Sequence, residues 1–172
     1  MALSLVESTD AYVVGASGPV LIGSFRLEAQ PDSVRAFART CDALKARHAR
    51  FAMIGTAEDA AKPPESAVRQ SIVAMLRAYA GSLVAVSFLI EGTGFRASLL
   101  RGITTGVTAM SRDAAAYHVA STGLGASRWV ADQLLVRGVR NVPPAQLLAL
   151  DLERLREAPV GADPGSVPAP EQ

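Results

Sequence analysis

Two histidines are the side chains of this sequence best suited to acid–base chemistry near neutral pH. His48 lies at the expected end of a helix, and His118 lies in a short apolar run that is followed by Ser121 and Thr122. A serine close to a histidine is common, and the chain has no Gly-x-Ser-x-Gly turn of the kind that activates a serine nucleophile. We therefore expect both histidines to be structural and the chain not to be an enzyme.

The single cysteine, Cys41, excludes an intramolecular disulfide. It falls between Phe37 and Leu44 on an apolar stripe with helical spacing, which predicts a buried and unreactive thiol. No group of cysteines and histidines has the spacing of a zinc site. The sequence therefore predicts neither a bound metal nor a cofactor.

A glycine-containing loop is the main candidate for a ligand site. Glu91-Gly92-Thr93-Gly94 follows the most apolar segment, and Arg96 stands in the first turn of the helix expected after it. Such loops bind anions through free helical N–H groups, but a P-loop lysine is missing and Glu91 would repel an anion. We favour a tight turn that needs glycine dihedral angles. The alternative is a small-molecule or anion site formed by Glu91, Thr93, Gly94 and Arg96, with His118 as a further contributor.

The composition is that of one folded domain. The 172 residues are 49% apolar and 19% charged, and the formal net charge is +1. That charge gives no field to attract nucleic acid or an acidic lipid surface. The longest apolar run, residues 83–90, is far shorter than the roughly 20 residues of a membrane span, and residues 1–10 do not have the pattern of a secretory signal. We expect a cytoplasmic protein with neither a membrane nor a nucleic-acid partner.

Short apolar runs typical of strands alternate with segments of helical apolar spacing. Strands are expected over 11–16, 19–27, 50–55, 82–90 and 116–120, and helices over 31–48, 63–80, 95–110, 122–137 and 145–157. This β-β-α-β-α-β-α-β-α order plus one added helix predicts an α/β fold, with a mixed, mostly parallel sheet and an antiparallel hairpin at one edge. The expected organisation is a lead-in over 1–10, the α/β domain over 11–138, an appended helix within 139–158 and a disordered tail over 159–172.

Two late helices carry features that indicate association. Gly102 and Gly106 lie one turn apart in the helix over 95–110, where each glycine costs about 1 kcal/mol relative to alanine. That cost indicates a close backbone approach, either to the domain's own sheet, which we favour, or to another subunit. The same helix is expected to bury one face, formed by Phe95, Leu99, Ile103, Val107 and Met110.

The last helix has more leucines than a helix buried on one side needs. We expect Leu148, Leu152 and Leu155 to be candidates for covering a neighbouring chain, and Trp129 to be a docking partner for this helix within the chain.

The order of elements resembles that of STAS-type domains, found in anti-sigma-factor antagonists and in the cytosolic tails of sulphate transporters. The local sequence adds to the resemblance through the basic end of the first helix (Lys45, Arg47, His48), the helix start Pro63-Pro64-Glu65, the passage from Glu91 to Arg96 and the helix around Ala126–Trp129. The details are most similar to small STAS-like bacterial proteins of unassigned function. The resemblance covers residues 11–137.

The resemblance implies a regulatory module that binds other proteins. Antagonists of this type carry a phosphorylated serine in an Asp-x-Ser motif after the third strand. The matching stretch here, Ile54-Gly55-Thr56-Ala57-Glu58-Asp59, lacks that aspartate and serine, so Thr56 is its only candidate phosphorylation site. The sequence therefore supports a non-enzymatic, homodimeric interaction module of bacterial signalling, with a protein or a second copy as partner. A small-molecule or anion-binding protein, or a minor enzyme, is the alternative.

Overall fold

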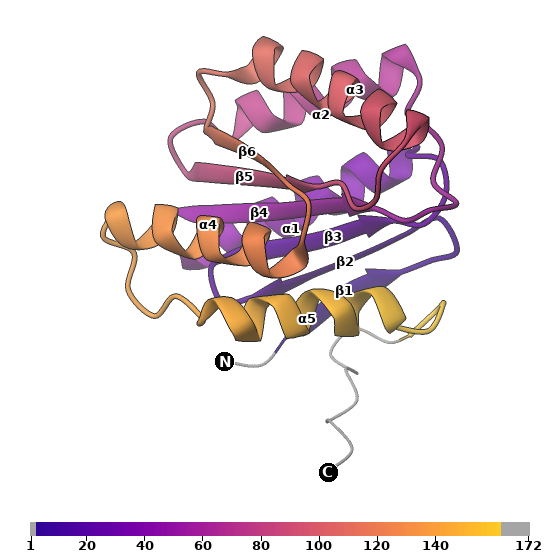
Figure 1. The fold of residues 1–172 in the computed structure, drawn as a ribbon. Coiled ribbons are helices and arrows are strands. Elements are labelled where there is room, and N and C mark those ends of the chain that lie inside the picture. The colour runs from indigo at the N-terminus through magenta and orange to yellow at the C-terminus, as the bar shows by residue number, and fades with distance from the viewer. Residues whose placement is uncertain (1–2, 163–172) are drawn as a thin grey trace.

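The computed structural model describes residues 3–162, and six strands and five helices are found in this part of the chain (Figure 1). Their order is β1 (Ser4–Ser8), β2 (Tyr12–Ser17), β3 (Val20–Phe25), α1 (Pro31–Arg47), β4 (Phe51–Ala57), α2 (Ser66–Ala78), β5 (Leu83–Leu89), α3 (Phe95–Ser111), β6 (Ala116–Ala120), α4 (Gly123–Val136) and α5 (Ala145–Glu157).

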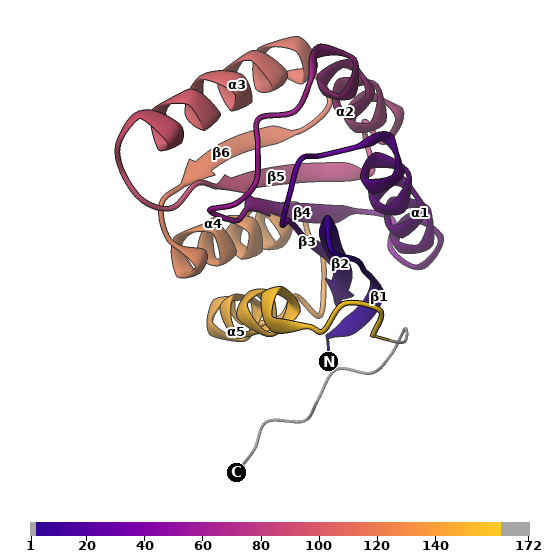
Figure 2. The ribbon, with the colours of Figure 1, turned by 90° about the vertical axis from the view of Figure 1, so that its right-hand side faces the viewer.

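The strands form one mixed sheet in which their spatial order equals their order along the chain. β1 and β2 pair antiparallel, as do β2 and β3, whereas β3 to β6 pair parallel. Crossovers between parallel strands are right-handed, and from β3 to β6 each crossover leads to the next strand in the same direction across the sheet. The crossover helices α1, α2 and α3 therefore lie on one face of the sheet. Figure 2 shows α4 and α5 covering the other face. The α/β class and the mostly parallel sheet are confirmed.

The first strand lies where the sequence predicts only a lead-in, so that prediction is wrong for residues 4–8. β1 pairs with β2 at the sheet edge, and Leu3 and Leu5 are buried. A five-residue strand with serine at both ends has too little alternation to be distinguished from a loop by its sequence. The Gly161 N–H donates to the Ser8 carbonyl at 2.9 Å, so residues 159–162 return to this strand. The rest of the predicted tail lies outside the described residues.

α5 belongs to the core of the domain. Leu148, Leu152 and Leu155 are fully buried against the sheet together with Val13 and Ile22. The prediction that these leucines cover a neighbouring chain is therefore wrong, because the open sheet face beside α4 requires a second helix over β2 and β3.

Close packing explains why two positions of the sheet are occupied by glycine. A Cβ at Gly15 would lie 2.7 Å from the Ser4 carbonyl oxygen of the neighbouring strand, and a Cβ at Gly23 would overlap the ring of Phe37. Gly23 thereby lets the α1 side chain Phe37 lie flat on the sheet, where it stacks on Phe25 with ring centroids 5.2 Å apart. These glycines set the distance between the sheet and its neighbours.

α3 is rotated relative to the expectation from its sequence. Its buried residues are Ala97, Leu100, Thr104, Val107 and Ser111. The predicted buried face is thus confirmed only for Val107, whereas Phe95, Leu99 and Met110 are exposed. The helix has apolar residues on several sides, and its small residues allow it to approach the domain closely, so hydropathy alone could not orient it.

Candidate functional site

The residues of the predicted ligand loop point to different parts of the molecule. The Glu91 carboxylate pairs with Arg156 of α5 at 3.0 Å. The Arg96 guanidinium instead donates to the Glu58 carbonyl and pairs with Asp59 at 3.4 Å, both in the connection after β4. The structure therefore does not bring Glu91 and Arg96 together around a common ligand position.

The glycines of this loop are accounted for by the backbone. Gly92 and Gly94 have φ angles of +77° and +91°, which L side chains rarely adopt. Gly94 is the N-cap of α3, Thr93 is exposed, and the Arg101 side chain donates to the Ile90 and Gly92 carbonyls at 3.3 and 3.2 Å. Both nearby arginines are thus engaged in holding loop backbone, as expected for a structural turn.

His118 lies on the opposite side of the sheet from α3, below α4. Its Nδ1 lies 3.2 Å from the Ser87 hydroxyl, and its ring stacks on Trp129 of α4 with centroids 4.9 Å apart. Burial lowers the pKa of His118 below its usual value, which favours the neutral ring. Ser87 is fully buried, whereas His118 is partly exposed, and His118 lies on the other side of the sheet from α3, so it does not converge with Arg96. This stack holds the Trp129 ring in place. Trp129 also packs against the core cluster that contains the buried leucines of α5.

Thr56 and Cys41 are inside the protein. Thr56 is a residue of β4, not of a helix start, and its buried hydroxyl donates to the Leu89 carbonyl at 3.2 Å. A kinase cannot reach this hydroxyl in the folded domain, so the candidate phosphorylation site is not supported. Cys41 is fully buried, and desolvation raises the pKa of its thiol to about 12.

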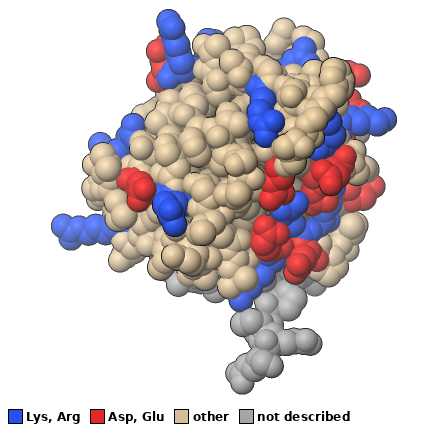
Figure 3. Space-filling view, viewed as in Figure 1, with Lys and Arg blue, Asp and Glu red and all other residues tan. Residues whose placement is uncertain are grey.

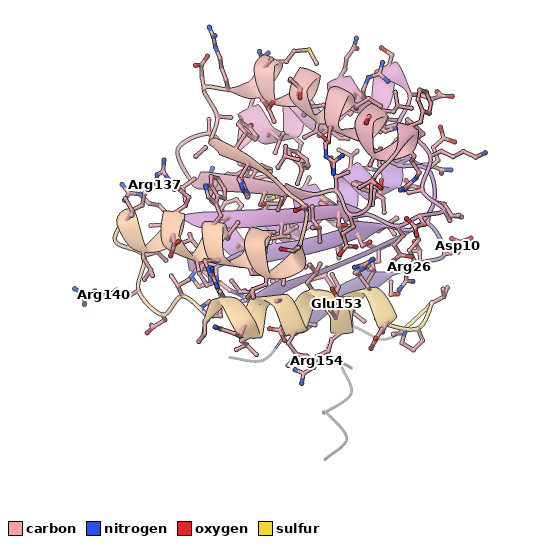
Figure 4. All side chains as sticks on the ribbon, viewed as in Figure 1. Asp10, Arg26, Arg137, Arg140, Glu153 and Arg154 are labelled. Atoms are coloured by element: carbon pink, nitrogen blue, oxygen red, sulfur yellow. The ribbon has the colours of Figure 1, made fainter. Side chains whose placement is uncertain are left out.

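Arg26 organises the charged edge of the sheet. Its guanidinium donates to the carbonyls of Arg156 and Ala158, at 3.0 and 2.5 Å, and thereby caps the C-terminus of α5. Its Nε also lies 3.8 Å from the Glu58 carboxylate. Figure 4 shows Arg26 beside the C-terminal end of α5. Carboxylates and arginines at this edge neutralise each other, which leaves little free charge to bind an anion.

Neither a metal site nor a membrane-spanning helix is found in residues 3–162. No group of three or more histidine, cysteine or acidic side chains there could hold a metal ion. The same residues contain no helix with the length and hydropathy required to cross a bilayer.

The most distinctive surface is the outward side of α3, which we call the α3 outer face: Phe95, Leu99, Gly102, Gly106, Ala109 and Met110. Phe95 is 85% exposed, Leu99 40% and Met110 46%. Apart from the adjacent residues and backbone of α3 itself, a Cβ at Gly102 or Gly106 would meet no atom within 4 Å in the described part of the chain. The favoured interpretation of these glycines, a close approach to the domain's own sheet, is therefore wrong.

The charged side chains of α3 itself do not lie on the α3 outer face. Arg96 and Arg101, the charged residues of this helix, turn toward the loops. The hydroxyls of Thr105 and Thr108 donate to carbonyls of α3 itself. Figure 3 shows a mixed cluster of acidic and basic side chains at the right of the molecule, with scattered charged side chains elsewhere in the same view. Sequence reasoning found the glycines but not the face that they occupy.

Comparisons with models of protein families, with curated proteins and with solved structures found no match for this chain.

Proposed function

We propose that this protein is a non-enzymatic interaction module that pairs with a second copy of itself through the α3 outer face. The observation that carries this function is the glycine pair, Gly102 and Gly106, lying open between exposed Phe95, Leu99 and Met110. An uncharged apolar helix face of this kind is typical of a surface that another protein covers.

The glycines support a helix–helix contact in particular. Each glycine destabilises the isolated helix by about 1 kcal/mol relative to alanine, and no contact with another part of the domain requires a glycine at either position. Two α3 helices crossing at these positions would approach more closely than the 8–10 Å usual for helices with larger side chains. A two-fold axis through the crossing would make both copies use the same residues.

The rest of the molecule supports binding more than catalysis. The Ser87 hydroxyl is buried, one face of the His118 ring is covered by Trp129, and the arginines near the Glu91–Gly94 loop are engaged with protein groups. The resemblance of the sequence to STAS-type domains leads us to include a regulatory role in the bacterial cytosol in this proposal. Anion binding at Arg96 is the weaker candidate.

Multi-angle light scattering after size exclusion tests this function. We expect the mass of a dimer for the wild type and the mass of a monomer for Leu99→Arg, because a charge would be buried in the contact. Leu135→Arg is the matched control, since Leu135 is 58% exposed on α4, and it should remain dimeric. A monomeric wild type, or equal effects of both variants, would reject the proposal.

A further inference from the structure

An apolar cavity of about 110 Å³ lies on the α1–α3 side of the sheet. Its walls come from β4 and β5 toward their C-terminal ends and from the inner sides of α2 and α3, with Gly55, Phe88, Ile103 and Val107 among the lining residues. The C-terminal ends of parallel strands are where open α/β sheets hold their ligands. The cavity is separate from the α3 outer face, because it lies beneath the same helix.

The close packing that explains Gly15 and Gly23 does not explain Gly55, which borders the cavity. Gly15 and Gly23 each lack the space for a Cβ, whereas a Cβ at Gly55 would meet only the Phe88 ring, at 3.9 Å. Gly55 also lies outside the left-handed backbone region. Neither a neighbour nor its dihedral angles requires glycine there, so what the glycine preserves is the open space itself.

The size and the apolar lining of the cavity indicate what the apolar part of a ligand would be. An enclosed apolar cavity of about 150 Å³ in a protein binds benzene; the space here is smaller, about 110 Å³, but reaches the exposed Lys62, so it suits a ligand no broader than a single ring or a short branched chain. The Thr56 hydroxyl on its wall is already bonded to the Leu89 carbonyl. A polar group on the body of the ligand would therefore find few partners.

The charge near the surface defines the other end of the ligand. Lys62, in the connection between β4 and α2, is exposed and is the one charged residue lining the cavity. Glu58 and Asp59 are paired with Arg26 and Arg96. Within the described part of the chain no carboxylate lies within 4.0 Å of the Lys62 amine, which leaves it able to meet an anion.

We propose that the cavity binds a small carboxylic acid whose compact apolar body fills the space and whose carboxylate faces Lys62. Binding of this ligand does not require a dimer, so the inference stands or fails independently of the function proposed for the α3 outer face.

Titrations followed by ¹H–¹⁵N NMR test this site with three probes that share one phenyl ring: toluene, phenylacetate and phenethylamine. We expect toluene and phenylacetate to shift amide signals of β4, β5 and α3 around the cavity, and phenethylamine to bind at least about tenfold more weakly than phenylacetate. Absence of binding by both toluene and phenylacetate would overturn the inference, as would shifts confined to other surfaces.

Variants separate the two parts of the site. Gly55→Val should fill the cavity and weaken phenylacetate and toluene by more than about tenfold, while circular dichroism shows an unchanged fold. Ile103→Phe fills the space from the opposite wall, and should do the same if Gly55→Val fails to fold. Lys62→Gln should remove the preference for phenylacetate and leave toluene unchanged, whereas Lys45→Gln, on the exposed side of α1, should change neither. Wild-type affinities in the folded cavity-filling variants would contradict the site.

Discussion

The Ser17 hydroxyl donates a 2.7 Å hydrogen bond to Oδ2 of Asp151, and both side chains are buried. The bond joins the end of the β2 strand to the middle of α5, two elements far apart in the sequence. Arg154 lies 3.5 Å from the other oxygen of the same carboxylate. This contact makes the last helix a fixed part of the sheet assembly.

Replacing Ser17 by alanine should destabilise the domain. The buried Asp151 carboxylate would lose a hydrogen bond to a charged group, a loss of about 1.5–3 kcal/mol in the free energy of unfolding. Urea unfolding measures this change. Glu153→Ala on the exposed side of α5 is the control, and it should change the free energy by less than about 0.5 kcal/mol. Glu153 and Arg154 are labelled in Figure 4. Equal effects of Ser17→Ala and Glu153→Ala would refute a structural role for this bond.

Removing α5 should prevent stable folding. Leu148, Leu152 and Leu155 are fully buried, and each contributes about 2 kcal/mol by burial. Their sum is comparable to the whole stability of a domain, about 5–15 kcal/mol. We expect a chain ending at Arg140 to lose the dispersed NMR spectrum that a chain ending at Ala162 retains. A well-dispersed spectrum from the shorter chain would show that α5 is an accessory after all.

Acidification should destabilise the protein through His118. Burial lowers the pKa of the folded-state ring, so below the ordinary value of about 6.5 the unfolded chain binds a proton that the folded chain does not. The stability that comes from keeping His118 neutral is fully present above the ordinary pKa and is lost as the pH falls toward the lower folded-state pKa. Urea unfolding at about pH 7.5 and pH 5.5 should show the decline. It should be smaller in His118→Gln and retained in His48→Gln; the same decline in all three proteins would contradict this origin.

The sheet was predictable because its central strands are strongly apolar and each is followed by a helix with regular apolar spacing. β1 was not, since its short sequence has no such pattern and only its pairing with β2 makes it a strand. The leucines of α5 were recognised as unusual but assigned to another chain, because a sequence does not show that the face over β2 and β3 needs a cover. The orientation of α3 and the cavity at Gly55 depend on packing distances that no residue spacing specifies.

Gly102→Ala and Gly106→Ala should separate folding from association. Each substitution should raise the stability of the monomer by about 0.5–1 kcal/mol, because alanine favours the helix and its Cβ meets open space. The same methyl groups would separate two crossing helices and weaken the dimer. Thermal unfolding at low concentration and sedimentation equilibrium measure the two effects. Stabilisation without a change in dimer affinity would leave these glycines with no role in the contact.

The most direct test of the α3 contact is disulfide formation by Gly102→Cys under mild oxidation. Two α3 helices crossing at this position would bring the two Cα atoms within about 4.4–6.8 Å, the range that a disulfide spans, and the covalent bond would hold the helices together even though the larger side chain weakens the free contact. Buried Cys41 should not react, and Leu135→Cys on α4 provides the control. We predict rapid conversion of Gly102→Cys to a covalent dimer while Leu135→Cys stays largely uncoupled. Equal, slow coupling of the two variants would contradict a dimer built on the α3 outer face.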